Sequence, residues 1–554
     1  MEVHSRSMAT NRPSDAIHIY MTEVACRLVA KTGIPSDRYH LGKLILQGLK
    51  EDPEFLLQID GGTGETETCG SVLARSVRLA RVLQRRGFGI GDVIVIMAPN
   101  NIHVCVPMYA AFYLGVAVAC VDLGLGVNEM RDLFTLLTPK AVFCLPDKGG
   151  EIQKALAAAN VDSKIVTFGN TEKFISFEEM LNENGKKEPV DEFKAVDFDP
   201  DETLAMLIST SGSTGSAKSI SASHKNLVIG LPYFWNLFQQ FPTPTRLTLV
   251  LSPLQWYSAI FQFVLSPVLR HTRLHTSSQT TPEHIFHLVN KYRPTFTMIA
   301  PSIVALLLSN ADKCDVTCFD VIFSSGSAAY MKSFDDIKTI SPKTQLVNLY
   351  GQSEVGAAFF FDPAVTTSFG KVASHLDYRL VDVDTLQDVT EPNTPGELWL
   401  RGPSVCKGYY KRPVETAETL VDGWLRTGDI MYRDHHDYFY YVDRHKMMLK
   451  YRNYQISPLE LEGVIQRHPG VHEVGVSGVP DALCGDLPVA FVVPRPGVAV
   501  SADEIQDLVK EHLSDSKQLR GGVRFVQQLP LTATAKIDRQ KLKSMAKELA
   551  TRNL

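Results

Sequence analysis

The sequence predicts an α/β protein: a large N-terminal domain of two doubly wound sheet subdomains plus a small β-subdomain, followed by a small α+β C-terminal domain. Three observations support this. Apolar strand and helix patterns alternate from about residue 70 to 145 and again from about 295 to 335. Short strands joined by Gly, Pro and acidic turns follow residue 365, and a compact α+β pattern follows residue 445. A chain of 554 residues is longer than a single hydrophobic core usually supports, so several domains are expected.

The first alternation begins with SVLARSVRLARVLQRRG, residues 71–87, which has apolar residues at helical spacing and ends at Gly87. DVIVIMAPN, residues 92–100, is a β-branched run followed by a turn. Residues 103–124 have the pattern of a buried helix leading into another strand, and AVFCLPD, residues 141–147, adds one more strand. This order predicts a parallel sheet with helices on both faces.

The later segments follow in the expected order. TFTMIAPSIVALLLSN and VIFSSGSAAYMKSF repeat the strand–helix pattern at residues 295–310 and 321–334. The β-subdomain is predicted from three short strand patterns, DYRLVDVDT, GELWLRGPS and YFYYVDRHKMMLKY. The C-terminal domain is predicted from the strands EVGVSGVPD and PVAFVVPRP and the helices SPLELEGVIQRH and SADEIQDLVKEHL.

Composition narrows the function class. The net charge of −5 gives no reason to expect a nucleic acid or a membrane surface as partner. The cysteines are scattered, and the closest pair, Cys314 and Cys318, has no second pair or histidine beside it, so reduced thiols are expected rather than a metal site. No apolar run is long enough for a membrane span. The N-terminus does not resemble a secretory signal, so a cytoplasmic location is expected, with a peroxisomal one as the alternative although the final TRNL does not match the peroxisomal signal Ser-Lys-Leu.

The stretch TSGSTGSAKSIS, residues 210–221, is nearly a Walker A loop. That motif needs Gly, four residues, Gly, Lys and then Ser or Thr, but Ala217 stands at the second glycine position. A Walker A loop also leads from a strand into a helix. Here the alternation SISASHKN after Lys218 predicts a second strand. The stretch is therefore expected to join two strands of a hairpin, and a P-loop NTPase is disfavoured.

The composition of this loop still suits phosphate. Gly212 and Gly215 let backbone N–H groups turn inward as an anion nest. Hydroxyl groups come from Ser211, Ser213 and Thr214, and Lys218 adds a positive charge. A flexible surface loop is the alternative explanation.

With four later motifs, the loop resembles the adenylate-forming superfamily, which includes acyl-CoA synthetases, plant 4-coumarate–CoA ligases, beetle luciferases and peptide-synthetase adenylation domains. YGQSEVG resembles the aromatic-Gly-x-Thr-Glu motif, and GELWLRGPSVCKGYYKRPVETAE with DGWLRTGD resembles the ribose-side block. VDRHKMMLKYRNYQISPLELEGVI resembles the hinge, and LPLTATAKIDRQKL resembles the terminal lysine loop. The resemblance runs from about residue 50 to 545, and KYRNYQISPLELE is most similar to insect luciferase-like acyl-CoA ligases.

The resemblance implies an ATP-dependent acyl-CoA ligase. Such an enzyme activates a carboxylic acid, fatty or aryl, as an acyl-adenylate with release of pyrophosphate, and then transfers the acyl group to coenzyme A. The first step brings an anion to a polyanion, so it needs Mg²⁺ and fixed positive charge. The implied partners are therefore the acid, ATP and coenzyme A, with a monomeric enzyme acting in fatty acid and lipid metabolism.

The matching positions imply roles for individual residues. Phosphate contacts would come from Thr210, Ser211, Gly212, Ser213, Thr214, Gly215 and Lys218, and Mg²⁺ ligands from Thr214 and Glu354. The nucleoside would be bound by Tyr350, Gly351 and Ser353, by Gly326, Ser327 and Ala328 on the opposite wall, and by Asp429 and Arg444 at the ribose. The acyl pocket would be lined by Gln255, Trp256, Tyr257, Leu349 and Gly326.

The family also implies a mobile C-terminal domain. Lys536 would reach between the carboxylate and the α-phosphate during adenylation, as a compact point charge. Rotation about a hinge at Lys446 would then present Lys450 for the thioester step. The expected division is a poorly ordered segment 1–20, a large adenylation domain 21–443 and a small domain 444–554.

Several positions depart from the family pattern. Ala217 and Ser219 replace a proline and a glycine of the loop, and Gln255 stands where the family has a gate histidine. Glycines are replaced at Leu349, Asn453 and Ala535. None of these changes removes a charge needed for adenylation. Leu349 adds methylene-sized groups worth about 0.8 kcal/mol each, so a narrowed or redirected acyl pocket is expected.

Two other functions remain open. The departures motivate an impaired relative that only binds nucleotide or acyl ligand, and a luciferase-like monooxygenase would follow the same adenylation with O₂ in place of coenzyme A. A peptide-synthetase module is disfavoured. Single residues also have simpler explanations: Asp429 could cap a turn, Glu354 a helix starting near Ser353, and Lys536 could be an ordinary loop lysine. DHHD, residues 434–437, is expected to be a solvated hairpin turn and His224 to have an ordering role.

Overall fold

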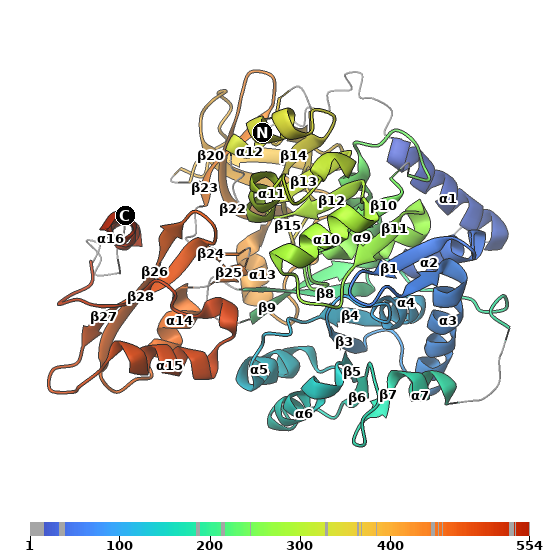
Figure 1. Cartoon of the computed structure of the whole chain (residues 1–554), viewed down its shortest axis with the longest axis horizontal. Coiled ribbons are helices and arrows are strands. Elements are labelled where there is room, and N and C mark those ends of the chain that lie inside the picture. Colours follow the sequence, from blue (N-terminus) through green and yellow to red (C-terminus); the bar gives the residue numbers. More distant parts are fainter. Residues whose placement is uncertain are drawn as a thin grey trace.

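The computed structural model describes residues 16–32, 39–183, 189–211, 217–243, 245–326, 331–362, 365–366, 368–383, 385–444, 449–452, 454–456, 458–530, 537 and 539–552. Figure 1 shows a large domain, described for residues 16–444, and a small C-terminal domain, described for residues 449–552, beside it. Helix α1 begins at Ala16, so it starts inside the segment 1–20 that was expected to be poorly ordered.

The first sheet of the large domain has the strand order β7-β6-β5-β3-β4-β8-β9 and is parallel except for the antiparallel pair β8–β9. Its strands are β3 (Val93–Met97), β4 (Ala117–Cys120), β5 (Ala141–Cys144), β6 (Lys164–Thr167), β7 (Ile175–Ser176), β8 (Leu204–Ser211) and β9 (Ala217–Ser223). The accompanying helices are α3 (Cys69–Arg85), α4 (Cys105–Leu114), α5 (Val127–Leu137), η1 (Pro146–Lys148), α6 (Gly149–Ala158) and α7 (Phe177–Asn182). The predicted first alternation is confirmed, including the end of α3, where Gly87 has a φ of +77° that favours glycine.

The second sheet has the order β14-β13-β12-β10-β11-β1-β2 and is parallel except for β2. Its strands are β1 (Leu56–Asp60), β2 (Thr66–Thr68), β10 (Leu247–Leu249), β11 (Thr272–His275), β12 (Phe296–Ile299), β13 (Val321–Ser325) and β14 (Gln345–Leu349). The helices are α1 (Ala16–Thr32), α2 (Leu41–Glu51), α8 (His224–Gly230), η2 (Leu231–Trp235), α9 (Tyr257–Leu269), α10 (Pro282–Tyr292), α11 (Pro301–Ser309), η3 (Val316–Cys318) and α12 (Met331–Ile340). Two doubly wound subdomains were therefore predicted correctly.

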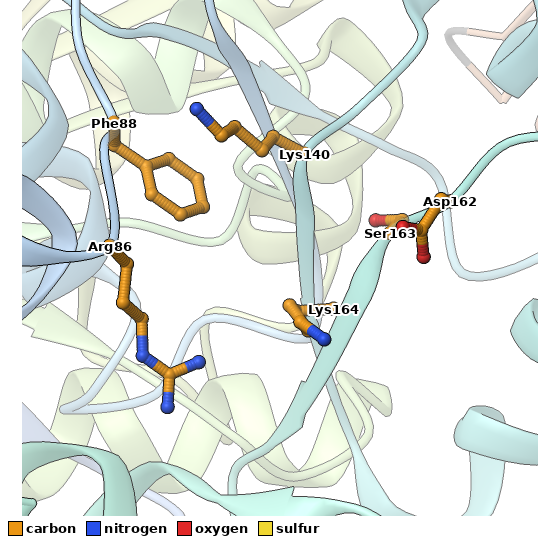
Figure 2. A pocket seen from close by; sticks show the side chains of 6 residues that line it. All are labelled: Arg86, Phe88, Lys140, Asp162, Ser163 and Lys164. Carbon is orange, nitrogen blue, oxygen red and sulfur yellow. The ribbon is translucent and has the colours of Figure 1, made fainter.

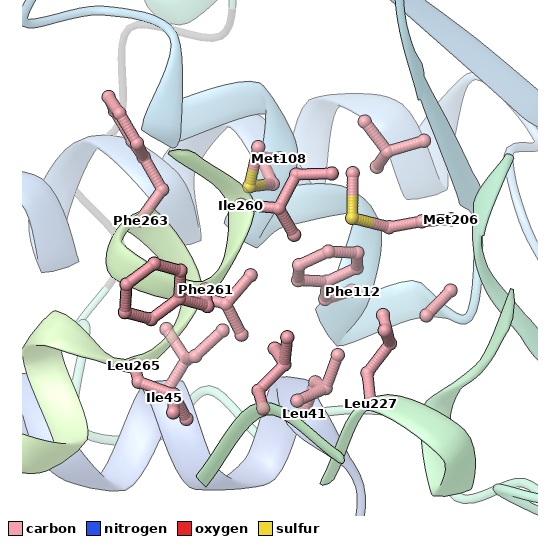
Figure 3. Packing of buried hydrophobic residues seen from close by; sticks show 14 of the residues in the cluster. Leu41, Ile45, Met108, Phe112, Met206, Leu227, Ile260, Phe261, Phe263 and Leu265 are labelled. Atoms are coloured by element: carbon pink, nitrogen blue, oxygen red, sulfur yellow. The ribbon is translucent and has the colours of Figure 1, made fainter. Parts of the chain in front are cut away.

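One hydrophobic core joins the two sheets. Figure 3 shows Met108 and Phe112 of α4 packed with Ile260 and Phe261 of α9. The same cluster includes Phe143 of the first sheet together with other buried side chains of the second. All residues of α4 and residues 259–269 of α9 are buried, because both helices lie in the interior rather than on a surface. The shared core fixes the carboxyl ends of both sheets relative to one another.

The β-subdomain follows as expected. Two short hairpins, β15 (Gly351–Gln352) with β16 (Gly356–Ala357) and β17 (Phe359–Phe360) with β18 (Lys371–Val372), lead into a five-stranded sheet. That sheet contains β19 (Asp377–Val381), β20 (Gly396–Arg401), β21 (Leu420–Val421), β22 (Trp424–Arg433) and β23 (Phe439–Arg444), with α13 (Pro413–Thr419) before β21.

The C-terminal domain is an α+β unit with two apolar faces. Its elements are β24 (Leu449–Tyr451), β25 (Tyr454–Ile456), α14 (Pro458–Ile465), β26 (Val471–Asp481), β27 (Gly485–Pro494), α15 (Ala502–His512), η4 (Asp515–Lys517), β28 (Gly522–Phe525) and α16 (Arg539–Arg552). Alternate residues of β27 serve opposite faces, as strand geometry requires. Ala490 and Val492 pack with the β24–β25 hairpin, α14 and α15, whereas Val489 and Phe491 pack with α16.

Within the described part of the chain, no helix combines the length and the apolar character needed to cross a membrane.

Candidate active site

The loop that raised the phosphate hypothesis joins two antiparallel strands, as predicted. Thr210 at the end of β8 pairs in register with Lys218 of β9. Gly212, Ser213, Thr214 and Gly215 lie outside the described residues, and only the backbone of Thr210 and Ser211 is described. Lys218 is only 7% exposed, so it belongs to a buried strand and not to a mobile surface loop.

Lys218 is positioned by a segment almost two hundred residues further along the chain. Residues 407–410 run along the free edge of β9, where Ser221 N donates to Gly408 O at 2.8 Å and Tyr410 N donates to Ser219 O at 2.7 Å. This places the Tyr409 ring against Lys218, with the ammonium 5.0 Å from the ring centroid. A cation–π contact of this kind fixes a lysine without neutralising it.

Tyr409 also contacts Glu354. Its hydroxyl donates to Glu354 Oε1 at 3.0 Å, and Cys406 N donates to Glu354 O at 2.8 Å. Burial and the nearby Glu354 carboxylate raise the pKa of the Tyr409 phenol, so it remains a donor at physiological pH. Glu354 lies in the turn between β15 and β16 and does not cap a helix. Tyr409 thus links two opposite charges: its ring contacts the Lys218 ammonium and its hydroxyl binds the Glu354 carboxylate.

A second group surrounds Asp429. Tyr350 Oη donates to Asp429 Oδ2 at 2.7 Å, and Gln352 Nε2 donates to the same oxygen at 2.5 Å and to Thr427 O at 2.9 Å. Asp429 is 5% exposed and lies within β22, so it does not cap a turn. Its backbone pairs with that of Arg444, which brings these two predicted ribose-side positions together.

The carboxyl ends of β13 and β14 add the wall beside Tyr350. Ser325 pairs in register with Leu349, so Gly326 and Tyr350, the next residues of each strand, are neighbours. Gly326 has a φ of +97°, a backbone conformation that favours glycine. Leu349 is buried. Ser327 and Ala328 lie outside the described residues.

The predicted acyl-pocket residues belong to the large domain, and one of them, Trp256, contacts the C-terminal domain. Gln255 hydrogen-bonds Asp122, which follows the carboxyl end of β4. The Trp256 ring packs edge-on against Tyr454 of the C-terminal hairpin, with centroids 5.4 Å apart. The Tyr257 ring turns inward and packs against Phe234. Of these three residues, Trp256 contacts the hairpin directly.

The C-terminal domain presents its hairpin to the site. Strand β25 lies beside β8, and Tyr454 contacts Trp256. Lys450 is in β24 of this hairpin and is anchored by a hydrogen bond from its backbone N–H to Asp486 Oδ2 at 3.0 Å. Lys446 and Lys536 lie outside the described residues. Leu529 and Ile537, which flank the segment containing Lys536, pack with α16 on the opposite face of β27, the side away from the large domain (Figure 1).

Two other histidine-containing segments lie outside this site. His224 is fully buried among His40, Phe112 and Phe198, and burial lowers its pKa. Residues 434–437 form the predicted hairpin turn between β22 and β23.

A depression of about 330 Å³ is lined by six residues, three of them basic (Figure 2). Lys140 there is paired with Asp92 at 2.8 Å, and Arg86 with Glu183. Since Lys140 and Lys164 stand at the amino ends of β5 and β6, this depression lies at the opposite edge of the sheet from the site.

Comparison with known proteins agrees with this geometry. The family described as AMP-binding enzyme matches residues 48–410, and the AMP-binding enzyme C-terminal domain matches residues 460–536. The chain belongs to this family of adenylate-forming enzymes, whose nucleotide is ATP. It is 29% identical to a luciferin 4-monooxygenase of Photuris pensylvanica, covering 85% of this chain and 88% of the relative. It is 26% identical to a probable CoA ligase of Humulus lupulus, covering 92% of each.

A solved structure of similar fold is the luciferase-like enzyme from the nonluminescent Zophobas morio mealworm. The identity is 27% and the TM-score 0.68, with 75% of this chain and 97% of that chain covered.

The sequence did not single out Tyr409 or Gln352. Both lie inside stretches that were recognised, CKGYYKRP and YGQSEVG. The signal for Tyr409 was a pair of tyrosines after a glycine, but which of the two would turn inward depends on the pairing of residues 407–410 with β9.

Proposed function

We propose that the protein is an ATP-dependent acid–thiol ligase of the AMP-forming type. It activates a fatty or aryl carboxylic acid as an acyl-adenylate and transfers the acyl group to coenzyme A. The observation that supports this most is the meeting of three groups at one edge: the Lys218–Tyr409–Glu354 group, the Asp429 group and the Lys450 hairpin. The first two suit a nucleotide, and the third suits a second reaction step at the same cavity.

In this proposal the polyphosphate lies along the β8–β9 loop. Lys218 supplies fixed positive charge, and Tyr409 holds it in a defined position. The adenine lies between Tyr350 and Gly326, and Asp429 accepts hydrogen bonds from the ribose hydroxyls, with its carboxylate oriented by Tyr350 and Gln352. A carboxylate held in advance by two donors needs little reorganisation when the ligand binds.

Glu354 is a hard oxygen donor next to the loop, and it fits Mg²⁺ in charge and ligand type. Thr214 would complete the protein ligands. When bound, the ion would neutralise phosphate charge during attack by the carboxylate. Tyr409 orients the Glu354 carboxylate through one oxygen, and this bond is independent of the ion.

The two lysines of the C-terminal domain divide the reaction. The described orientation brings the hairpin with Lys450 to the large domain, which suits attack by the coenzyme A thiol on the acyl-adenylate. Lys536 would act in the other orientation, reached by rotation about Lys446 between a large domain 21–443 and a C-terminal domain 444–554. One cavity then performs both steps in sequence. A monomer is sufficient for this cycle.

The experiment that tests the proposal is a panel of fatty and aryl acids incubated with ATP, Mg²⁺ and coenzyme A. The proposal predicts equal amounts of pyrophosphate, AMP and acyl-CoA for at least one acid. Pyrophosphate release without acyl-CoA would contradict the thiol step, and nucleotide binding without pyrophosphate would identify an impaired relative. Light emission with luciferin and O₂ would identify a monooxygenase, the activity named for the Photuris relative.

A further inference from the structure

A buried ion-pair cluster joins the two domains beside the Lys450 hairpin. Lys517 of η4 donates to Glu129 of α5 at 2.7 Å and to Glu460 of α14 at 2.8 Å. The Lys517 side chain is 15% exposed and that of Glu129 is 10% exposed. Glu129 belongs to the large domain, whereas Glu460 and Lys517 belong to the C-terminal domain. One of the two ion pairs therefore crosses the domain interface.

The surroundings make this interdomain pair strong. Burial disfavours the charged form of Lys517, but the Glu460 and Glu129 carboxylates outweigh that effect and raise its pKa. Burial raises the pKa of Asp122, which lies at the same interface. Charges removed from water interact more strongly than exposed ones, and close charge pairs at interfaces are strongly coupled.

The Glu129–Lys517 ion pair can break without leaving either charge unpaired. When the domains separate, Lys517 keeps Glu460, because both belong to the C-terminal domain. Glu129 keeps a second partner too, since its Oε2 accepts from Gly126 N at 3.0 Å as part of the cap of α5. Losing one partner of a buried pair is normally severe because the other charge stays uncompensated. Here each charge retains a partner in both situations.

We propose that the Glu129–Lys517 ion pair is a reversible latch that holds the C-terminal domain in the orientation presenting Lys450, and so favours the thioester half-reaction over adenylation. The inference rests on the proposed function, because only a two-step enzyme needs two orientations. Lys517 and Glu129 are positioning residues, since they act through the placement of the hairpin.

The first test separates the half-reactions. Glu129→Gln keeps the helix cap, because glutamine can accept the Gly126 N–H, and removes only the charge. It should slow acyl-CoA formation from a supplied acyl-adenylate about tenfold and leave adenylation equal or faster. The matched control, Glu460→Gln, takes a carboxylate from the same lysine but leaves the interdomain pair and should not separate the two rates. An equal loss of both half-reactions in Glu129→Gln, or the same separation in the control, would overturn the latch.

The second test traps the docked orientation with a disulfide. A Cβ at Gly124 would lie 3.9 Å from the Cβ of Ser514 across the interface, which is within the range for a disulfide. The double variant Gly124→Cys/Ser514→Cys, oxidised with diamide, should form an internal crosslink visible as a gel shift, whereas the single variants should not. The crosslink should support thioester formation but block adenylation until it is reduced.

Adding Glu129→Gln to the double variant should slow crosslinking about threefold or more, because the rate follows the population of the docked orientation. A crosslinking rate independent of Glu129, or no crosslink at all, would overturn the proposal. If crosslinking depends on Glu129 but no acid yields acyl-CoA, the ion pair holds the interface and the proposed function fails instead.

Discussion

The hydroxyl of Tyr409 offers the most specific perturbation of the nucleotide side of the site. Tyr409→Phe keeps the ring that contacts Lys218 and removes the hydroxyl, which donates to Glu354 at 3.0 Å and also hydrogen-bonds Thr419. A hydrogen bond to a charged group is worth about 1.5–3 kcal/mol. If Glu354 must be held for adenylation, kcat/KM should fall about 10- to 150-fold. Tyr409→Leu also removes the cation–π contact with Lys218. It should therefore lose about 0.5–2 kcal/mol more of transition-state stabilisation than Tyr409→Phe.

The assay is carboxylate-dependent exchange of labelled pyrophosphate into ATP, which reports adenylation alone. Thioester formation from a supplied acyl-adenylate should be unchanged, since Glu354 is placed on the phosphate side. The control is Tyr410→Phe, because Tyr410 belongs to the same segment but packs against the core of the first sheet. Wild-type exchange in Tyr409→Phe, or an equal loss in both half-reactions, would refute the argument that Tyr409 acts through Glu354.

Three further predictions follow from other parts of the structure. Asp429→Asn should raise KM for ATP about tenfold or more, because the carboxylate held by two donors is lost; an unchanged KM in the exchange assay would remove Asp429 from the nucleotide site. Lys536→Ala should lose adenylation about a hundredfold yet thioesterify a supplied acyl-adenylate, and Lys450→Ala should do the reverse; equal failure of both variants in both steps would exclude the two-orientation cycle. Burial lowers the pKa of His375 from 6.5 to about 3. As the pH falls below 6.5, this histidine is therefore protonated in the unfolded chain but stays neutral in the folded protein. Stability should fall by about 1.4 kcal/mol per pH unit from this group down to pH 3, and His375→Gln should flatten the measured dependence by that amount; an unaltered slope would contradict it.

Local pattern was sufficient for much of the fold. The β-branched run of β3 indicated a parallel sheet covered on both faces. The structure agrees, because β3 is buried along its whole length. The alternation after Lys218 distinguished a hairpin from a Walker A loop, because side-chain period is a local property. Motif order then located Asp429, Glu354 and Tyr350, and the structure brings these residues to one edge.

The rest depends on contacts between distant segments. Tyr409 reaches Lys218 only because residues 407–410 pair with β9, and no local pattern encodes that pairing. Gln352 looked like a variable position within its motif until Asp429 was placed beside it. Lys517 is one basic residue in an ordinary polar stretch, and its importance comes from the packing of two domains. Long-range pairing and domain docking are tertiary properties that a single sequence does not display.

The measurement that tests the central claim most directly is the product balance with the acid panel. With a suitable fatty or aryl acid, ATP, Mg²⁺ and coenzyme A, the account predicts AMP, pyrophosphate and acyl-CoA in equal amounts, with acyl-CoA lost in Lys450→Ala while pyrophosphate exchange persists. No pyrophosphate with any acid, from a folded protein that binds ATP, would contradict it.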